Sequence, residues 1–190
     1  QIAWLTALRG SDIAFNPFFL SRALISEDSA ELFLTSDNLS NEVKAHLKEA
    51  SWEIGDYSAF EARLKCLQGA TVLYSPSEVT AELLSIIANN TQIKATIFEH
   101  GIDLIKAVKT PEEIKGLREV AKMDSRTIDA FIEDVRARLK RGETLTEYDL
   151  SVILHEHRAR NPGFISESFE TIAAINANAA QPHYAPTKEK

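Results

Sequence analysis

His183 is the residue whose type and setting could most readily do chemistry. It lies between Pro182 and Pro186, and the proline rings restrict the backbone around a single imidazole. This pattern predicts a rigid strand that carries one proton donor or acceptor. The sequence offers no paired nucleophile and base and no set of metal-binding carboxylates, so the residues alone allow one positioned acid or base, and a structural role for His183 is the favoured alternative.

The remaining histidines are weaker candidates. In His155-Glu156-His157 the two imidazoles lie two residues apart, and on a helix such side chains point about 200° apart. They cannot both face one ion, so the pattern predicts a solvated helix end. His46 and His100 are expected to be partly exposed polar residues and not ligands.

The string Arg9-Gly10-Ser11-Asp12 precedes Asn16-Pro17-Phe18-Phe19. This order predicts a turn that carries charged side chains into a cleft. A structural ion pair, buried or capping, is the alternative. The sequence contains no G-x-x-x-x-G-K-[ST], G-x-G-x-x-G or H-E-x-x-H string, so it gives no support for a phosphate-binding loop or a helix-borne zinc site.

Composition limits the class of protein that positions these residues. The chain has 190 residues, 44% of them hydrophobic and 26% charged, as is typical of a soluble globular protein. A formal net charge of −7 argues against a nucleic acid or an anionic membrane surface as partner. The longest apolar runs have four residues, against about 20 for a membrane-spanning helix. A single cysteine, Cys66, and no recognisable secretory leader favour a reducing cytoplasm.

The first part of the chain alternates predicted strands and helices, which indicates an α/β layered domain. The strands are expected over Ile2–Leu5, Ala30–Thr35 and Gly69–Tyr74. The helices are expected where apolar residues repeat every three or four positions, namely around Leu39, Val43 and Leu47, around Phe60, Leu64 and Leu67, and around Val79, Leu83, Ile86 and Ile87.

The second part begins with a strong helix signal. Thr110-Pro111-Glu112-Glu113 combines an N-cap hydroxyl, a proline at the first helical position and a carboxylate three residues on. A helix of about 30 residues, or about 45 Å, should run from there to Lys140. A second capping box, from Thr144 to Glu147, predicts another helix that ends before Asn161-Pro162-Gly163.

A hairpin is expected after these helices. Its strands are predicted over Phe169–Ile175 and Ala180–Tyr184, with a turn at Asn176-Ala177-Asn178, and they would carry His183. Because Gln1 leads directly into an apolar segment and the predicted strand at His183 is followed by only a few residues, we expect the chain to be an internal piece of a larger protein.

Several segments together resemble the Xaa-Pro aminopeptidase (aminopeptidase P) family. The string Ala3-Trp4-Leu5-Thr6-Ala7-Leu8-Arg9-Gly10-Ser11-Asp12 with Asn16-Pro17-Phe18-Phe19 is similar to the family's middle domain. Lys106 to Ile114 resembles the passage into its catalytic domain, and Ser168 to Thr187 resembles the first catalytic hairpin. Only Asn178 matches the family's usual Gly-Pro-Asn-Gly turn, because Asn176-Ala177-Asn178-Ala179 stands there.

The resemblance implies an α/β fold with a creatinase-like second domain over 1–106, incomplete at its N-terminus. Residues 107–190 would then be the N-terminal part of a pita-bread catalytic domain that is incomplete at its C-terminus. Family members remove an N-terminal residue that precedes proline, using a hydroxide between two divalent metal ions, commonly manganese. Their metal ligands all follow the H-Y segment, so the resemblance implies that this chain binds no metal and is inactive alone.

One family site maps onto this sequence. The resemblance implies that His183 contacts the bound peptide near the scissile bond and helps to orient or shuttle a proton, as both catalytic and substrate-binding residue. It also implies peptide substrates with proline at the second position and a homodimer in the full-length form. Two alternatives remain open: a prolidase-like or creatinase-like hydrolase, and a metal-free pita-bread module that binds peptides or proteins.

Overall fold

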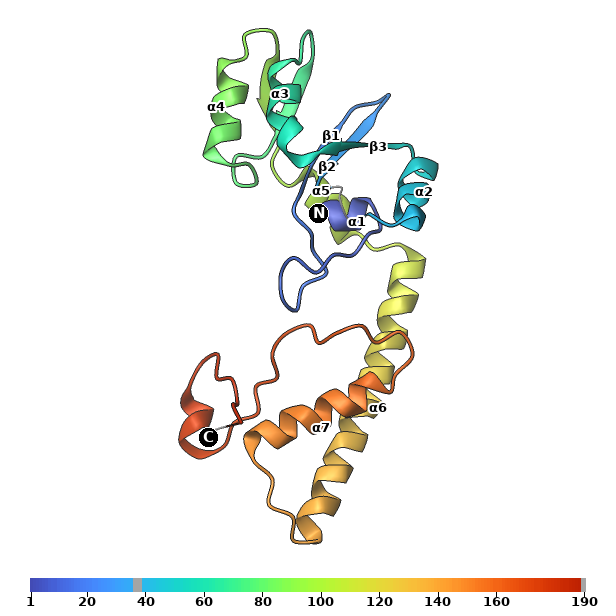
Figure 1. The fold of residues 1–190 in the computed structure, drawn as a ribbon, viewed down its shortest axis with the longest axis vertical. Coiled ribbons are helices and arrows are strands. Elements are labelled where there is room, and N and C mark those ends of the chain that lie inside the picture. Colours follow the sequence, from blue (N-terminus) through green and yellow to red (C-terminus); the bar gives the residue numbers. More distant parts are fainter. Residues whose placement is uncertain (36–38, 189–190) are drawn as a thin grey trace. The chain divides into compact units, whose positions relative to one another are not determined.

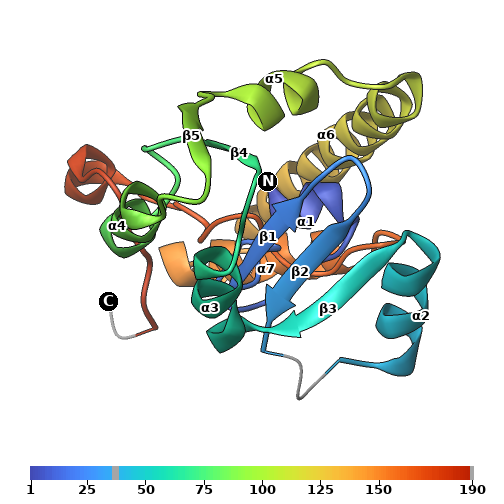
Figure 2. The ribbon, with the colours of Figure 1, turned by 90° about the horizontal axis from the view of Figure 1, so that it is seen from above.

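The computed structural model describes residues 1–35 and 39–188, and the chain forms two compact units. Unit 1 comprises Gln1–Ile13 and Pro17–Val108, and unit 2 comprises Ala14–Asn16 and Lys109–Lys190. Figures 1 and 2 show their elements in colours that follow the sequence. No helix within the described ranges is long and apolar enough to cross a membrane.

Unit 1 contains two small sheets, each with a parallel pair of strands. Parallel neighbours need a crossover connection, and a helix supplies it in both cases, α2 between β2 and β3 and α4 between β4 and β5. β1 pairs with β2 in antiparallel fashion and completes the first sheet. The elements are α1 (Ile2–Leu5), β1 (Ser21–Ile25), β2 (Ala30–Leu34), α2 (Asn41–Glu49), β3 (Trp52–Asp56), η2 (Tyr57–Ala59), α3 (Phe60–Lys65), β4 (Thr71–Tyr74), α4 (Ala81–Asn89), β5 (Lys94–Ile97) and α5 (Gly101–Ala107).

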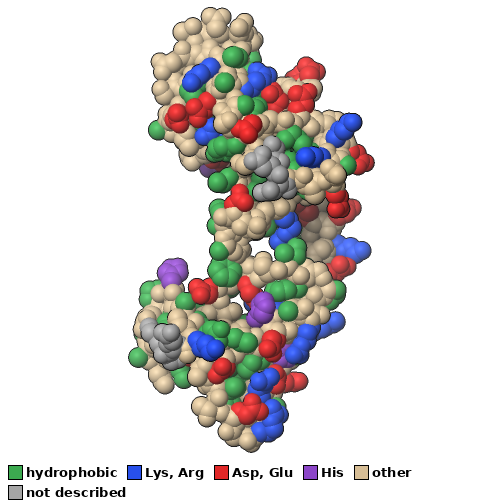
Figure 3. All heavy atoms as spheres, in the orientation of Figure 1, with side chains coloured by type: hydrophobic (Ala, Val, Ile, Leu, Met, Phe, Trp, Pro, Cys, Tyr) green, Lys and Arg blue, Asp and Glu red, His purple; other side chains and the backbone are tan. Residues whose placement is uncertain are grey.

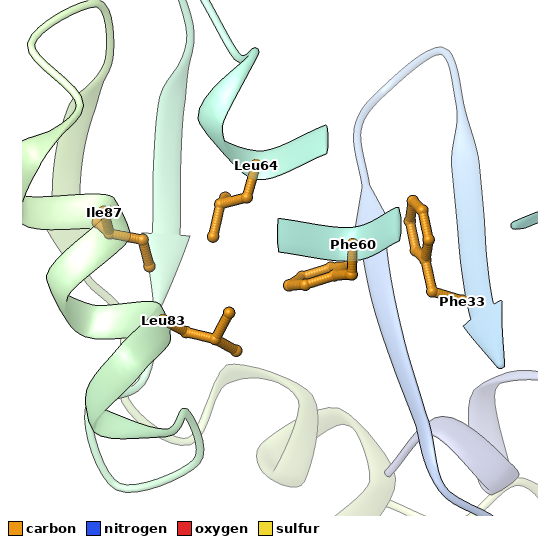
Figure 4. Close-up of a cluster of buried hydrophobic side chains, with 5 residues drawn as sticks. All are labelled: Phe33, Phe60, Leu64, Leu83 and Ile87. Carbon is orange, nitrogen blue, oxygen red and sulfur yellow. The ribbon is translucent and has the colours of Figure 1, made fainter. Parts of the chain in front are cut away.

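The core of unit 1 lies on both faces of β2. Successive side chains of a strand point to opposite faces, so Leu32 and Leu34 lie on one face and Phe33 on the other. Leu32 and Leu34 pack with Leu47 of α2. Phe33 meets the ring of Phe60 edge-on at 5.1 Å and belongs to a second cluster, shown in Figure 4, with Leu64, Leu83 and Ile87. Burial of both faces explains why β2 is a run of apolar residues.

The sequence pattern placed α2, α3 and α4 correctly to within a few residues, but it did not predict α5. Ser40 and Thr80 cap α2 and α4 by accepting hydrogen bonds from the backbone N–H of Val43 and Leu83. The predicted strands at Ala30–Thr35 and Gly69–Tyr74 correspond to β2 and β4. Cys66 is exposed and ends α3.

The strand expected over Ile2–Leu5 is wrong, because these residues form the short helix α1. A four-residue apolar run does not distinguish a strand from a helical turn by periodicity. Here the hydrogen bonds of the segment are local and helical. Leu5 N–H donates to Gln1 O, and Thr6 N–H and the Thr6 hydroxyl both donate to Ile2 O.

Unit 2 is built on two helices, α6 (Pro111–Lys140) and α7 (Glu147–Ala159). The predicted capping box at the start of α6 is confirmed: Thr110 Oγ1 accepts from Glu113 N–H, and Glu113 Oε2 accepts from Thr110 N–H. The predicted end at Lys140 is also confirmed, and Gly142 follows with φ 83°. A short 3₁₀ turn, η3 (Asn176–Ala180), is the last regular element.

Polar contacts tie the loop after α7 back to both helices. Arg158 donates to Asp124 of α6 at 3.2 Å and to Glu167 at 2.8 Å. Asn161 donates to the hydroxyl of Thr127, the one residue of α6 classed as buried. These bonds fix where the chain leaves α7 and begins its course toward His183.

Many apolar side chains of unit 2 remain open to solvent. On α6, Leu117 and Val120 are 60% and 56% exposed. Figure 3 shows hydrophobic side chains in the lower half of the view, beside a mixture of acidic and basic ones. The apolar spacing of α6 therefore predicted the helix correctly, but a long apolar stripe of it is uncovered among the described residues.

The hairpin expected from Phe169 to Tyr184 is wrong. The described segment contains no strand, and η3 occupies the expected turn. Left-handed backbone at Asn176 (φ 52°) and His183 (φ 56°) interrupts the extended run, and side-chain acceptors compete with a strand partner for the backbone N–H groups.

Replacing Leu47 with alanine should destabilise unit 1 by about 2–5 kcal/mol, because Leu47 is fully buried against Leu32 and Leu34. Both tryptophans, Trp4 and Trp52, lie in unit 1, so their emission during urea unfolding reports on this unit. The exposed neighbour Lys48 is the control, and Lys48→Ala should change stability by less than about 0.5 kcal/mol. Equal midpoints for the two variants would contradict this packing.

Candidate functional site

His183 lies in an irregular segment at the end of unit 2. Its side chain is exposed, and its backbone is left-handed with φ 56°. Pro182 before it is exposed, whereas Tyr184 and Pro186 after it are buried. The predicted strand is absent. The segment is held at the residue after His183, because the Tyr184 hydroxyl donates a hydrogen bond to Glu147.

The anchor is the carboxylate of Glu147, at the start of α7. Its Oε1 accepts from Ile175 N–H at 2.5 Å, and its Oε2 accepts from Asn178 Nδ2 at 2.8 Å and from the Tyr184 hydroxyl at 2.6 Å. Asn178 Nδ2 also lies 3.1 Å from the Tyr184 oxygen. Figure 1 shows the turn η3 near the start of α7. We call Glu147, Ile175, Asn178 and Tyr184 the Glu147 cluster.

The local sequence explains why Glu147 is free for this role. The capping box predicted from Thr144 to Glu147 is wrong by two residues: Thr146 is the N-cap of α7, and Asp149 returns the hydrogen bond to Thr146 N–H. Asp149 thus satisfies the orphan backbone donors at the helix start. Glu147 is the first helical residue, and its side chain is left to reach the segment that carries His183.

The Glu147 cluster shifts the titration of its own members. The pKa of Glu147 is lowered, first by the hydrogen bond from Tyr184, then by that from the Ile175 N–H and, more weakly, by Asn178. The pKa of Tyr184 is raised, first by its hydrogen bond to the Glu147 carboxylate, with burial and charge acting in the same direction. The ionised carboxylate and the neutral phenol are therefore the favoured states.

An open hollow of about 350 Å³ lies beside the cluster. It is lined by Thr146, Glu147 and residues 175–178. Backbone and side-chain polar groups from α7 and η3 meet here. The hydrogen bonds to Glu147 hold the turn at η3 in place, and His183 follows this turn along the chain.

His155 and His157 contact different carboxylates, in line with their predicted divergence. His155 Nδ1 lies 3.2 Å from Glu167, and His157 Nε2 lies 3.2 Å from Asp134 of α6. The predicted solvated helix end describes His155, whose side chain is 56% exposed, but it is wrong for His157 at 11%. His157 packs between the helices because α7 crosses α6 at this point, and its ring also meets Phe131 edge-on.

Asp134 is the residue that His157 helps to hold ionised. Its pKa is lowered by the hydrogen bond from Arg138 first and by that from His157 second. The contacts among Arg138, Asp134 and His157 join α6 to α7 and stabilise unit 2. None of these residues belongs to the site around His183.

In unit 1, the string Arg9-Gly10-Ser11-Asp12 forms a turn that bonds to the segment after it. Gly10 N–H and Asp12 N–H donate to the carbonyls of Pro17 and Phe18, and Asp12 Oδ2 accepts from Leu20 N–H at 2.7 Å. A Cβ at position 10 would lie 2.5 Å from the Phe19 Cβ, so only glycine fits there. Asp12 therefore caps backbone, and in the described part of the chain Arg9 forms no ion pair with it.

His46 and His100 keep their expected polar surroundings. His46 is exposed and its Nε2 lies 2.9 Å from the Thr6 carbonyl oxygen. His100 is exposed with left-handed backbone before α5. Neither lies within a described group of three or more metal-binding side chains, and the residues 1–35 and 39–188 contain no such group.

The sequence singles out His183 as a candidate, and this stays a prediction; it gives no indication that Glu147 contacts the segment around His183. The sequence places Glu147 next to a capping threonine, and it was assigned there to the cap. Its partners Ile175, Asn178 and Tyr184 follow 28, 31 and 37 residues later. One signal could have found Glu147. Once Asp149 is recognised as the partner of Thr146 in the capping box, the Glu147 carboxylate is not needed for the cap.

Two family models cover nearly the whole chain. Residues 1–113 match the Creatinase/Prolidase N-terminal domain, and residues 115–190 match Metallopeptidase family M24. The second match contains Glu147, η3 and His183. The first contains the turn at Gly10 and all strands of unit 1.

Curated relatives share the length of the chain at moderate identity. A Probable Xaa-Pro aminopeptidase P of Pyricularia oryzae is 34% identical over 203 residues, which cover 100% of this chain and 32% of the relative. Xaa-Pro aminopeptidase 1 of Dictyostelium discoideum is 34% identical over 98% of this chain and 30% of its own length. The chain thus spans about a third of the length of the curated relatives it matches.

Solved structures agree with this assignment. An X-prolyl aminopeptidase from Caenorhabditis elegans, described as a cytosolic enzyme with a di-nuclear active site, matches 99% of this chain with TM-score 0.89 and 25% identity. The match covers 31% of that enzyme. A Xaa-Pro dipeptidase from Bacillus anthracis shares the fold, with TM-score 0.55 and 16% identity.

The α/β fold class expected from the sequence is confirmed by these matches, as is the resemblance to the Xaa-Pro aminopeptidases. The chain belongs to the creatinase/prolidase N-terminal domain family, whose model matches residues 1–113, and its residues 115–190 are similar to metallopeptidase family M24.

Proposed function

We propose that this chain is part of a metal-dependent aminopeptidase that hydrolyses the bond between an N-terminal residue and a following proline. The observation that carries the proposal is the likeness of 99% of the chain to the X-prolyl aminopeptidase of Caenorhabditis elegans at TM-score 0.89. The names of the curated relatives support the same activity over the alternatives of a prolidase and a metal-free binding module.

Within this proposal the metal ions are held by residues outside the chain. The described residues provide no group of side chains that fits a two-metal centre, so they support no step through one. In the complete protein two divalent ions, which we propose to be manganese, would supply an activated water. The di-nuclear site named for the Caenorhabditis elegans enzyme supports a pair of ions.

His183 is the residue of this chain that we propose to act on substrate. It would contact the bound peptide near the scissile bond and orient or shuttle a proton there. Its exposure and its anchored neighbour Tyr184 support this role, because a general acid or base must reach substrate from a fixed backbone.

We further propose a domain boundary between residues 106 and 107, with 1–106 as the creatinase-like domain and 107–190 as the start of the catalytic domain. The division of the compact units between Val108 and Lys109 supports it, as do the limits of the family matches. Substrates would be peptides with proline second, and the complete protein would be a cytoplasmic homodimer.

With manganese, the complete protein should cleave a peptide that begins Xaa-Pro and leave the matched peptide with alanine second intact. The 190-residue chain should cleave neither and should give no heat of binding when titrated with Mn²⁺ in a calorimeter. Cleavage of Xaa-Pro dipeptides alone would indicate a prolidase. Tight Mn²⁺ binding by the chain itself would contradict the placement of the ligands outside it.

Replacing His183 with alanine in the complete protein should lower kcat by about 10²- to 10⁴-fold, the usual contribution of a positioned acid or base. Steady-state kinetics on the Xaa-Pro peptide measure the change. His155→Ala is the control, because this exposed histidine of α7 contacts Glu167 and Phe164 and is not part of the Glu147 cluster. An unchanged kcat for His183→Ala would remove His183 from the reaction.

A further inference from the structure

We propose that Glu147 is a positioning residue for His183: by gathering donors before, within and after the turn at η3, its carboxylate fixes the backbone from which the imidazole projects. The inference rests on the proposed function, in which His183 contacts the bound peptide and orients or shuttles a proton. It adds a residue on α7 that otherwise has no assigned role.

The contacts of Glu147 span the whole turn. Ile175 N–H lies immediately before η3, Asn178 lies within it, and Tyr184 follows His183 directly. One carboxylate therefore closes a loop of the chain at both ends and holds its middle. Tyr184 is only 7% exposed, so its ring is held in the fold while its hydroxyl donates to Glu147.

The imidazole has no other support in the described part of the chain. His183 is exposed and makes no hydrogen bond with residues 1–35 or 39–188. Its orientation is set through the peptide bonds to its neighbours, and Tyr184 is the neighbour that is anchored. Loss of the Glu147 bonds would leave left-handed backbone at His183 without the restraint that maintains it.

The cluster needs a carboxylate at position 147. Three donors converge on the group, and an ionised carboxylate has only acceptors, whereas a glutamine would turn an N–H₂ toward one of the donors. Glu147 also stands at the first position of α7, where the helix dipole favours a negative charge. Glutamine has nearly the same shape, so Glu147→Gln is the appropriate substitution.

The first test needs no catalysis and uses the 190-residue chain. The amide proton of Ile175 should shift in NMR as Glu147 is protonated, with a midpoint below the usual range for glutamate, because Tyr184 and Ile175 stabilise the charged form. The restraint on the turn is thus complete above the ordinary glutamate pKa and is lost as the pH falls through the lowered one.

Two variants identify the groups that titrate. Tyr184→Phe should raise the midpoint toward the usual glutamate value, and Glu147→Gln should abolish the titration of the Ile175 amide. Tyr148→Phe is the control, because the Tyr148 side chain has no part in the cluster. The inference would be overturned if Tyr184→Phe left the titration midpoint unchanged. It would also be overturned if the chemical shift of the Ile175 amide still titrated in the Glu147→Gln variant.

The second test is a double-mutant cycle for kcat in the complete protein, combining Glu147→Gln with His183→Ala. Alone, Glu147→Gln should reduce kcat by about 10²-fold, a typical effect of displacing a reacting group by about 1 Å. With His183 already removed, the same substitution should cost less than about threefold, because Glu147 acts through the imidazole.

The matched control is Asp149→Asn, which weakens the cap of the same helix without touching the turn. Its effect on kcat should be small and the same with or without His183. If Glu147→Gln behaves additively as well, Glu147 merely stabilises the fold and the inference is wrong. If the wild-type protein fails to cleave Xaa-Pro peptides, the proposed function itself falls, and the Ile175 titration separately decides whether the cluster exists.

Discussion

One carboxylate organises the end of unit 2. Glu147 accepts hydrogen bonds from three groups that lie 28 to 37 residues further along the chain. The segment after α7 has no ladder of strand partners in the described residues, and its regular structure is limited to η3. Backbone carbonyls of Ile175 and Asn178 accept two hydrogen bonds within the turn, and the single carboxylate of Glu147 accepts those of Ile175 N–H, the Asn178 amide and the Tyr184 hydroxyl. His183 owes its setting to this arrangement.

Unit 1 is held by a different kind of interaction. Burial of apolar side chains on both faces of β2 joins two clusters, one with α2 and one with α3 and α4. Ion pairs such as Arg63 with Glu31 lie at its margin and are partly exposed, so they contribute little beside the core. Gly10 has no Cβ, which allows the turn at Arg9–Asp12 to lie close to Phe18 and Phe19. The two units therefore differ in what maintains them.

Local signals in the sequence were sufficient for much of the fold. The box at Thr110, the proline at α6 and the apolar run of β2 each act within a few residues, so they could be recognised directly. Contacts between distant residues could not: Ile2–Leu5 is a helix, and the segment around His183 is a polar turn with no hairpin. The sequence makes His183 a candidate through its immediate neighbours, whereas the contacts of Glu147 could not be predicted because its partners are remote in sequence.

The left-handed backbone at His183 narrows which residues can occupy this position. A non-glycine residue at φ 56° carries a strain of about 1 kcal/mol, and asparagine, aspartate and histidine tolerate it best. Glycine would relax the main chain but remove the ring, and asparagine would keep the main chain but cannot both donate and accept a proton as an imidazole can. Conformation as well as chemistry thus limits which side chains fit at this position, and histidine meets both demands at once.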